Sequence, residues 1–118
     1  MQRRFTKGFR ALVAWQEAKA LTLKIYRLTK TFPKEELFGL TSQLRRAASS
    51  IIANLAEGSA MPTKGHRDAY YYRARGSCTE VDNFSELTFE LQYISEKDFN
   101  DLSDHCARII YLITRLAQ

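Results

Sequence analysis

The chain has 118 residues, of which 45% are hydrophobic and 26% are charged. This length suits one folded domain and leaves no room for a second core, and this hydrophobic content excludes a disordered chain. No apolar run approaches the roughly 18–20 residues that a membrane span needs, so we expect no membrane partner.

The net charge of +5 is unevenly distributed along the chain. Residues 1–75 carry 15 basic and 5 acidic side chains, a net charge of +10. Residues 76–118 carry 3 basic and 8 acidic side chains, a net charge of −5. Two interpretations stay open: basic and acidic helices attract each other within one bundle, or a basic surface binds phosphate.

The N-terminal segment and the cysteines indicate the cellular compartment in which we expect the protein. The sequence MQRRFTKGFR is basic, but no apolar segment with a small-residue cleavage site follows it, so we predict no signal peptide. Two cysteines in such a chain are typical of reduced thiols. We therefore expect a cytoplasmic protein.

The first helix is predicted from about Leu12 to Phe32, after a basic N-terminal arm formed by residues 1–11. Its apolar side chains follow a spacing of three and four residues: Ala11, Ala14, Ala18, Leu21, Ile25, Leu28 and Phe32. Pro33 ends the helix, because the residue before a proline avoids the α-helical region.

The second helix follows the segment PKEE and contains a run of small residues that lets another helix come close. Its apolar face consists of Leu37, Leu40, Leu44, Ala47, Ile51 and Leu55. Gly58 is predicted to end the helix in the left-handed conformation. The segment from Ser59 to Gly65 is predicted to be a loop.

The third helix is predicted from Thr63 or Lys64 to Ile94. One broad face carries Tyr70, Tyr71, Ala74, Ser77, Cys78, Val81, Phe84, Ser85, Thr88 and Leu91. Leu87 lies on a second apolar face, which indicates burial against something beyond the monomer core. Gly76 in mid-helix costs up to about 1 kcal/mol relative to alanine, which a close helix crossing would offset.

The fourth helix begins at Ser95, which forms a near capping box with Asp98. Its apolar residues keep the spacing of three and four: Phe99, Leu102, Cys106, Ile109, Ile113 and Leu116. No strand pattern occurs. The sequence therefore predicts an all-α, up-down-up-down antiparallel four-helix bundle that spans residues 1–118.

No residue pattern is typical of an enzyme or a metal site. The candidate metal ligands are His66, His105, Cys78 and Cys106, and their spacing fits no zinc motif. Ser103, Asp104 and His105 are consecutive, so their side chains diverge around a helix instead of forming a triad. With no glycine-rich phosphate loop either, we predict no catalytic residue, no metal and no cofactor.

Cys78 and Cys106 are predicted to be core residues without a disulfide. An antiparallel pair of helices that turns near residue 96 places them eight residues out of register, about 12 Å along the axis. A disulfide needs Cα atoms within about 7 Å.

Asn54 and Glu57 are polar residues beside the apolar face of the second helix. In the structural interpretation, Asn54 forms hydrogen bonds across the bundle and fixes its register, while Glu57 pairs with Arg75 or Arg45. In the functional interpretation, they belong to a polar ligand site inside the bundle.

The basic residues are the remaining functional signal. The candidate nucleic-acid-binding residues are Arg3, Arg4, Lys7, Arg10, Arg45, Arg46, Lys64, Arg67, Arg73 and Arg75. Tyr70, Tyr71 and Tyr72 stand among these arginines and could stack on unpaired bases. The alternative is a solvated face with core tyrosines, and no helix-turn-helix or other named binding motif is present.

Four segments carry a family resemblance: VAWQEA (13–18), IYRLTKTFPKEELFGLTSQLRRAASSI (25–51), NLAEG (54–58) and ARGSCTEV (74–81). They closely resemble the four-helix-bundle proteins encoded in bacterial 23S ribosomal RNA intervening sequences, over nearly the whole chain. The resemblance implies a cytosolic bundle that assembles into a barrel-shaped homopentamer, with no catalytic activity. The chain is more distantly similar to the basic accessory variability protein of diversity-generating retroelements, which works with a reverse transcriptase and nucleic acid.

Two functional hypotheses follow from these observations. In the first, the protein is a non-enzymatic oligomer that binds structured RNA, such as ribosomal RNA, or another nucleic acid through a basic surface. In the second, it is a protein-interaction scaffold whose arginines form salt bridges between subunits.

Overall fold

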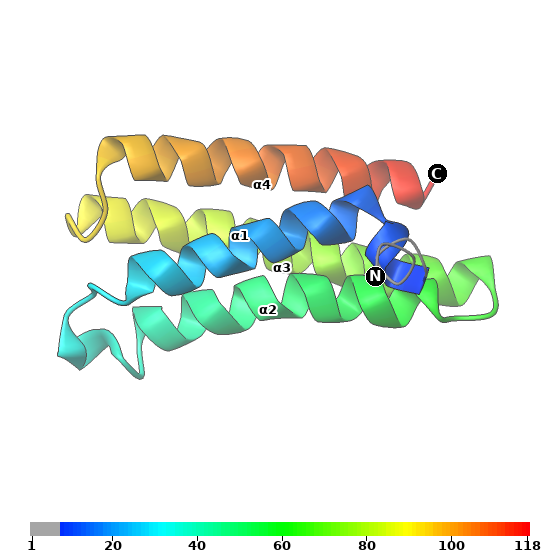
Figure 1. Ribbon diagram of the computed structural model, residues 1–118, viewed down its shortest axis with the longest axis horizontal. Helices are drawn as coiled ribbons and strands as arrows, with labels where there is room; N and C mark the ends of the chain where they lie inside the picture. The colour runs from blue at the N-terminus through cyan, green and yellow to red at the C-terminus, as the bar shows by residue number, and fades with distance from the viewer. Residues whose placement is uncertain (1–7) are drawn as a thin grey trace, which may run out of the picture.

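Four long helices lie side by side in the computed structural model, which describes residues 8–118 (Figure 1). They are α1 (Val13–Thr29), α2 (Leu40–Ser59), α3 (Lys64–Glu90) and α4 (Glu96–Leu116). Successive helices run in opposite directions, and each helix contacts two neighbours in the cyclic order α1, α2, α3, α4. This arrangement confirms the predicted all-α bundle. None of the described helices is both long enough and apolar enough to cross a bilayer.

The core is built from the apolar positions that recur every three or four residues along the helices. The large side chains that are fully buried include Leu21, Ile25, Leu44, Ile51, Leu55, Val81, Leu102, Ile109 and Ile113. Leu37 was predicted to belong to this set, but it is 52% exposed. It lies outside α2, in the connection before Leu40, where the helical period does not apply.

The last four residues of the predicted N-terminal arm (1–11) fold against the bundle. Gly8–Ala11 form a short 3₁₀ helix, η2, which contacts α1 and α2. The rings of Phe9 and Trp15 are 4.9 Å apart, so η2 is held against the start of α1. Residues 1–7 lie outside the described part of the chain.

The close contact between α2 and α3 depends on small residues. Ala47, Ala48 and Ala74 are fully buried. Gly58 was predicted to end α2 in the left-handed conformation, but it lies inside the helix, and Gly8 is the glycine with positive φ among residues 8–118. A Cβ atom at Gly58 would lie 2.9 Å from Cβ of Tyr70. Gly58 therefore allows α2 and α3 to approach each other closely. Gly76 has open space around it and does not contribute to this close approach.

The end of α3 differs from the prediction by one turn of helix. Gln92 adopts a positive φ of 65°, Tyr93 N donates to Thr88 O (2.9 Å), and Gln92 N donates to Phe89 O (2.9 Å). This pattern is a Schellman motif with glutamine in the position that glycine usually takes. The helix therefore ends at Glu90 and not at Ile94, and residues 91–95 connect it to α4.

The earlier turn brings the two cysteines to the same level of the bundle. Cys78 Sγ donates a hydrogen bond to Cys106 O (3.5 Å), so the predicted offset of eight residues is wrong. Both cysteines are fully buried free thiols. A hydrogen bond with Cys78, together with burial, raises the pKa of the Cys106 thiol, which keeps it protonated and unreactive at neutral pH.

The start of α4 confirms the predicted cap. The Ser95 hydroxyl accepts a hydrogen bond from Asp98 N (3.0 Å). The connection from α1 to α2 is less regular: it contains the 3₁₀ helix η3 (Lys34–Glu36), and the Glu36 carboxylate accepts a hydrogen bond from Leu40 N (3.1 Å). Glu36 therefore caps α2, because Gly39 at the N-cap position has no side chain to do so.

Candidate nucleic-acid interface

Seven of the ten predicted nucleic-acid-binding residues lie in the described part of the chain, and Arg3, Arg4 and Lys7 lie outside it. The seven residues come from η2, α2 and α3. A cation that is already paired with a carboxylate is less available to a phosphate than an unpaired one.

Two of the seven contact a carboxylate. An amino group of Arg46 lies 3.7 Å from Glu80 Oε2 on α3 and also donates to Gln43 Oε1 (2.6 Å). Lys64 pairs with Asp68 one helical turn later and donates to Ala117 O (3.1 Å). The Arg46 pair is exposed and is therefore weak, on the order of 0–1 kcal/mol.

The other five basic candidates have no carboxylate oxygen within 4.0 Å among residues 8–118: Arg10, Arg45, Arg67, Arg73 and Arg75. Arg67 donates to the main-chain oxygen of Met61 (3.3 Å), which leaves its charge uncompensated. The positive charge of the first three helices is thus largely available to an anionic ligand.

Several of these arginines lie on aromatic rings. The guanidinium carbon is 4.8 Å from the Tyr70 ring centre for Arg73 and 5.0 Å from the Tyr72 ring centre for Arg75. Such cation–π contacts hold the guanidinium in place without neutralising it. Arg75 also donates to Thr114 Oγ1 on α4 (3.3 Å), so it links α3 to α4.

The predicted tyrosine triplet divides between core and surface. Tyr71 is 5% exposed and lies against Gly58, and its burial raises the pKa of its phenol. Tyr72 is 49% exposed and Tyr70 is partly buried. The structure therefore assigns Tyr71 to the core, leaves Tyr72 on the surface and places Tyr70 between the two.

Arg45 contacts two side chains of α1. Its Nε atom donates to Thr29 Oγ1 on α1 (2.8 Å), and its guanidinium carbon is 4.7 Å from the centre of the Tyr26 ring. Thr29 is 3% exposed and is itself anchored, because its hydroxyl donates to Ile25 O (2.7 Å). Arg45 is thus held between α1 and α2 by two side chains that carry no charge.

Sequence reasoning missed two aromatic partners. Tyr111 is 58% exposed, and the guanidinium of Arg115 lies over its ring with the guanidinium carbon 5.9 Å from the ring centre. The spacing of four residues on one helix was a usable signal for this pair. The contact of Tyr26 with Arg45 joins two helices, so no local pattern reveals it.

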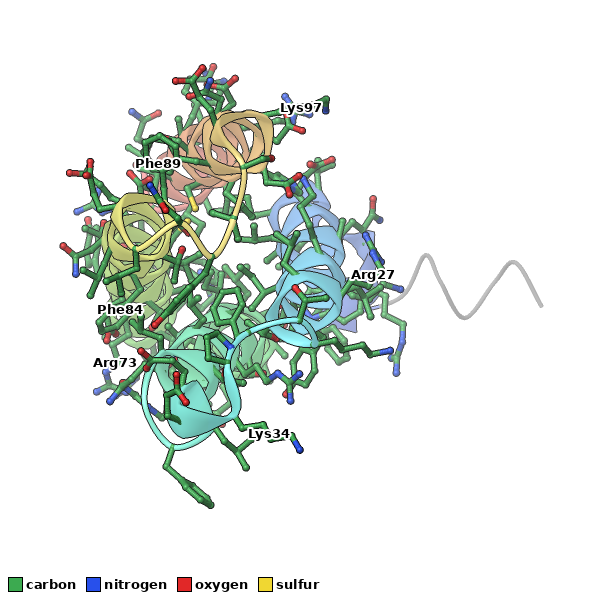
Figure 2. All side chains as sticks on the ribbon, turned by 90° about the vertical axis from the view of Figure 1, so that its left-hand side faces the viewer. Arg27, Lys34, Arg73, Phe84, Phe89 and Lys97 are labelled. Atoms are coloured by element: carbon green, nitrogen blue, oxygen red, sulfur yellow. The ribbon has the colours of Figure 1, made fainter. Side chains whose placement is uncertain are left out.

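The basic side chains do not form one patch. Figure 2, which looks along the bundle, shows Arg27 on α1 and Arg73 on α3 projecting from opposite sides. Lys34 projects from η3 at the near end of the bundle, below both. The cations therefore surround the described helices, and the groups between α1 and α2 are separate from those on α3.

Asn54 and Glu57 make contacts that differ from the predicted ones. Asn54 Nδ2 donates to Ser50 O (2.8 Å) and Ser50 Oγ (3.0 Å) one turn earlier on α2. The Ser50 hydroxyl in turn accepts from Ser77 Oγ on α3 (2.9 Å), so Asn54 acts across the bundle only through Ser50. Glu57 is exposed and pairs with no arginine among residues 8–118, so the predicted ion pair is wrong.

The candidate metal ligands do not converge. Among residues 8–118, no group of three or more His, Cys, Asp or Glu residues is placed to hold a metal ion. His105 Nε2 lies 3.0 Å from Glu17 Oε1 and joins α4 to α1, which gives it a structural contact.

Comparison with known proteins places the chain among relatives of the same fold. The model of the family described as "23S rRNA-intervening sequence protein" matches residues 10–115. A solved structure of a protein of unknown function from the S23 ribosomal protein family of Bacteroides thetaiotaomicron is similar, with a TM-score of 0.82 and 20% sequence identity. The match covers 89% of this chain and 95% of that one. No curated protein matches the chain.

Proposed function

Because the chain belongs to the 23S rRNA-intervening sequence protein family, we propose that it is a non-enzymatic protein that binds structured RNA or another nucleic acid through its basic surface. One observation carries this proposal. Five of the seven described basic candidates have no carboxylate within 4.0 Å among residues 8–118, so intramolecular ion pairs do not account for them.

Phosphate contacts are the expected source of affinity. Each Lys or Arg that contacts a phosphate releases condensed counterions, which gives binding that is strong at low salt and weak at high salt. The tyrosines that carry arginines add stacking surfaces for unpaired bases, each worth about 1–3 kcal/mol. Both contributions depend little on sequence, so we expect recognition of RNA shape and charge, with ribosomal RNA as the first ligand to test.

Salt dependence is the direct test of this proposal. Fragments of 23S ribosomal RNA with paired and unpaired regions are titrated with the protein at several salt concentrations from about 50 to 200 mM. We expect the logarithm of the association constant to fall linearly with the logarithm of salt, by about 0.7–0.9 per phosphate contacted. Absence of binding at the lowest salt concentration would overturn the proposal.

Exposed apolar side chains support a second proposal, in which the protein assembles with copies of itself and serves as a scaffold. Phe38 is 92% exposed beside Leu37, and Leu87 and Leu91 are each 45% exposed at the end of α3. Isolated apolar residues are ordinary on a surface, but such groups on two elements are typical of interfaces. The resemblance to family members suggests five copies.

Light scattering at low and high salt separates the two proposals. If the arginines form salt bridges between subunits, the oligomer dissociates as salt rises and the protein has no affinity for RNA. If the arginines bind nucleic acid, the apolar contacts keep the oligomer intact at high salt while RNA is released. A monomer under all conditions would overturn the scaffold proposal and leave RNA binding to be decided by titration.

A further inference from the structure

A pocket of about 460 Å³ opens between α1, η3 and the start of α2. We call it the α1–α2 pocket, and its polar side is formed by Lys30, Lys34, Thr41 and Arg45. Lys34, labelled in Figure 2, marks its position at the end of the bundle where α1 passes into α2. Its volume lies in the range of roughly 300–1,000 Å³ that is usual for pockets that hold small ligands.

Arg45 enters this pocket in a fixed orientation. Its Nε atom is bound by the buried Thr29 hydroxyl at 2.8 Å, and one face of the guanidinium is covered by Tyr26. Its two terminal amino groups have no hydrogen-bond partner among residues 8–118. A guanidinium that is held in this way loses little conformational entropy when those amino groups bind the two oxygens of a phosphate.

Thr41 supplies a second unpartnered group. The residue is 4% exposed, yet its hydroxyl makes no hydrogen bond with any residue from 8 to 118. Among residues 8–118, every fully buried side-chain nitrogen or oxygen atom has a hydrogen-bond partner. The Thr41 hydroxyl therefore reaches the opening of the pocket that it lines, where a ligand can bond to it.

The charge of the pocket is positive and uncompensated. Lys30, Lys34 and Arg45 line it with no carboxylate among its lining residues, and none of the three forms an ion pair within residues 8–118. The Glu36 carboxylate at the start of α2 is already engaged with Leu40 N (3.1 Å) and the Tyr93 hydroxyl (3.0 Å). Three cations suit a phosphate monoester, which carries a charge of about −1.5 to −2 at pH 7, better than a single carboxylate.

The remaining wall of the pocket is apolar. It consists of Phe32, Pro33 and Leu37, and the 52% exposure of Leu37 leaves that side chain free to contact a ligand. The Phe32 ring is fixed by the Tyr93 ring, whose centre is 5.4 Å away. An apolar wall beside a phosphate-binding group fits a flat, weakly polar ring, such as a nucleobase.

We propose that the α1–α2 pocket binds one nucleoside monophosphate unit, with the phosphate on Arg45, Thr41 and the two lysines and the base against Pro33 and Leu37. The same chemistry is offered by a free mononucleotide and by an unpaired nucleotide of an RNA strand. The identification of RNA as the natural source rests on the function proposed above. If RNA is the source, the pocket would hold one unpaired nucleotide whose base has left the base stack of the strand.

Calorimetry with defined probes tests the pocket. Adenosine 5′-monophosphate and uridine 5′-monophosphate are compared with adenosine, uridine and inorganic phosphate, using the full chain. We expect each monophosphate to bind at least about tenfold more tightly than either of its parts, because both halves of the pocket contribute. Equal affinity for the monophosphate and for inorganic phosphate would overturn the nucleotide assignment.

Variants locate the binding. Arg45→Gln and the surface pair Lys30→Gln with Lys34→Gln are expected to weaken monophosphate binding at least about tenfold each. Lys97→Gln removes a cation on α4 that lies outside the pocket and already faces Asp101 (2.9 Å), and it should leave monophosphate binding unchanged. Unaltered binding in the lysine pair, whose exposed side chains do not support the fold, would overturn the proposal even if Arg45→Gln failed to fold.

A parallel titration with RNA separates this inference from the proposed function. RNA binding without monophosphate binding overturns the pocket assignment and leaves the basic surface as the RNA site. Monophosphate binding without RNA binding supports the pocket and overturns the proposed function. Loss of RNA affinity in the lysine pair, together with competition between RNA and monophosphate, would identify a nucleotide of the RNA as the occupant.

Discussion

The α2–α3 interface and the α1–α2 pocket contain similar residue types but use them differently. At the interface, the Ser77 hydroxyl is bonded to Ser50 (2.9 Å), and the space beside Gly58 is filled by Tyr70 and Tyr71. At the pocket, the Thr41 hydroxyl has no partner among residues 8–118. Packing therefore explains the small and polar residues of the interface, whereas the Thr41 hydroxyl at the pocket is left open to water or to a ligand.

The largest expected difference between the two regions is in hydrophobic burial. Ile51 is fully buried in α2, so Ile51→Ala should lower the free energy of unfolding by about 2–5 kcal/mol. Leu37 at the pocket is 52% exposed, so Leu37→Ala should change the free energy of unfolding by no more than about 0.5 kcal/mol. Urea denaturation measures both values, and similar losses in the two variants would remove the distinction.

The second difference concerns close approach of the helices. In Gly58→Ala the new Cβ would lie 2.9 Å from Cβ of Tyr70, which cannot rotate away, and we expect a loss of about 1–3 kcal/mol. Gly76 on the exposed side of α3 is the matched control, because nothing lies within 4 Å of a Cβ there. Gly76→Ala should raise stability by up to about 1 kcal/mol. A gain in both variants would show that the interface tolerates a wider spacing.

The smallest expected difference concerns the hydroxyl groups. Ser77→Ala removes the hydrogen bond to Ser50 and should cost about 1 kcal/mol of unfolding free energy. Thr41→Val removes a hydroxyl that has no partner among residues 8–118, and the change should stay within about 0.5 kcal/mol. The reverse order in thermal or chemical unfolding would mean that Thr41 is structural and that its hydroxyl is not available to a ligand.

Local sequence patterns predicted most of the bundle. The four helices follow from apolar residues that recur every three or four positions, and the cap at Ser95 follows from a motif of four residues. The end of α3 did not follow, because Gln92 takes a left-handed conformation that sequence assigns to glycine. That one turn shifted the register with α4 and separated Cys78 from Cys106 in the prediction.

The candidate site was predictable only in part. The sequence identified Arg45 and Arg73 as cations, because charge needs no knowledge of the fold. It could not place Tyr26 and Thr29 beside Arg45, because those contacts join residues 16 or more positions apart on different helices. It also assigned Gly58 to a helix end, since a glycine that admits a neighbouring helix and a glycine that ends one have the same local signal.

Two double variants of equal charge test most directly whether cations without carboxylate partners bind nucleic acid. Arg73→Gln with Arg75→Gln removes two arginines that lie on tyrosine rings. Lys97→Gln with Arg108→Gln removes two cations that already face Asp101 (2.9 Å) and Glu17 (3.7 Å). Each double variant lowers the net charge by the same amount.

The measurement is the affinity of each double variant for one structured RNA fragment across a salt series. We predict that the Arg73 and Arg75 variant binds more weakly and loses about 0.7–0.9 of salt slope per contact, while the Lys97 and Arg108 variant binds like the parent. Equal weakening in both variants would show that only net charge matters, and no weakening in the first would contradict a phosphate-binding role for α3.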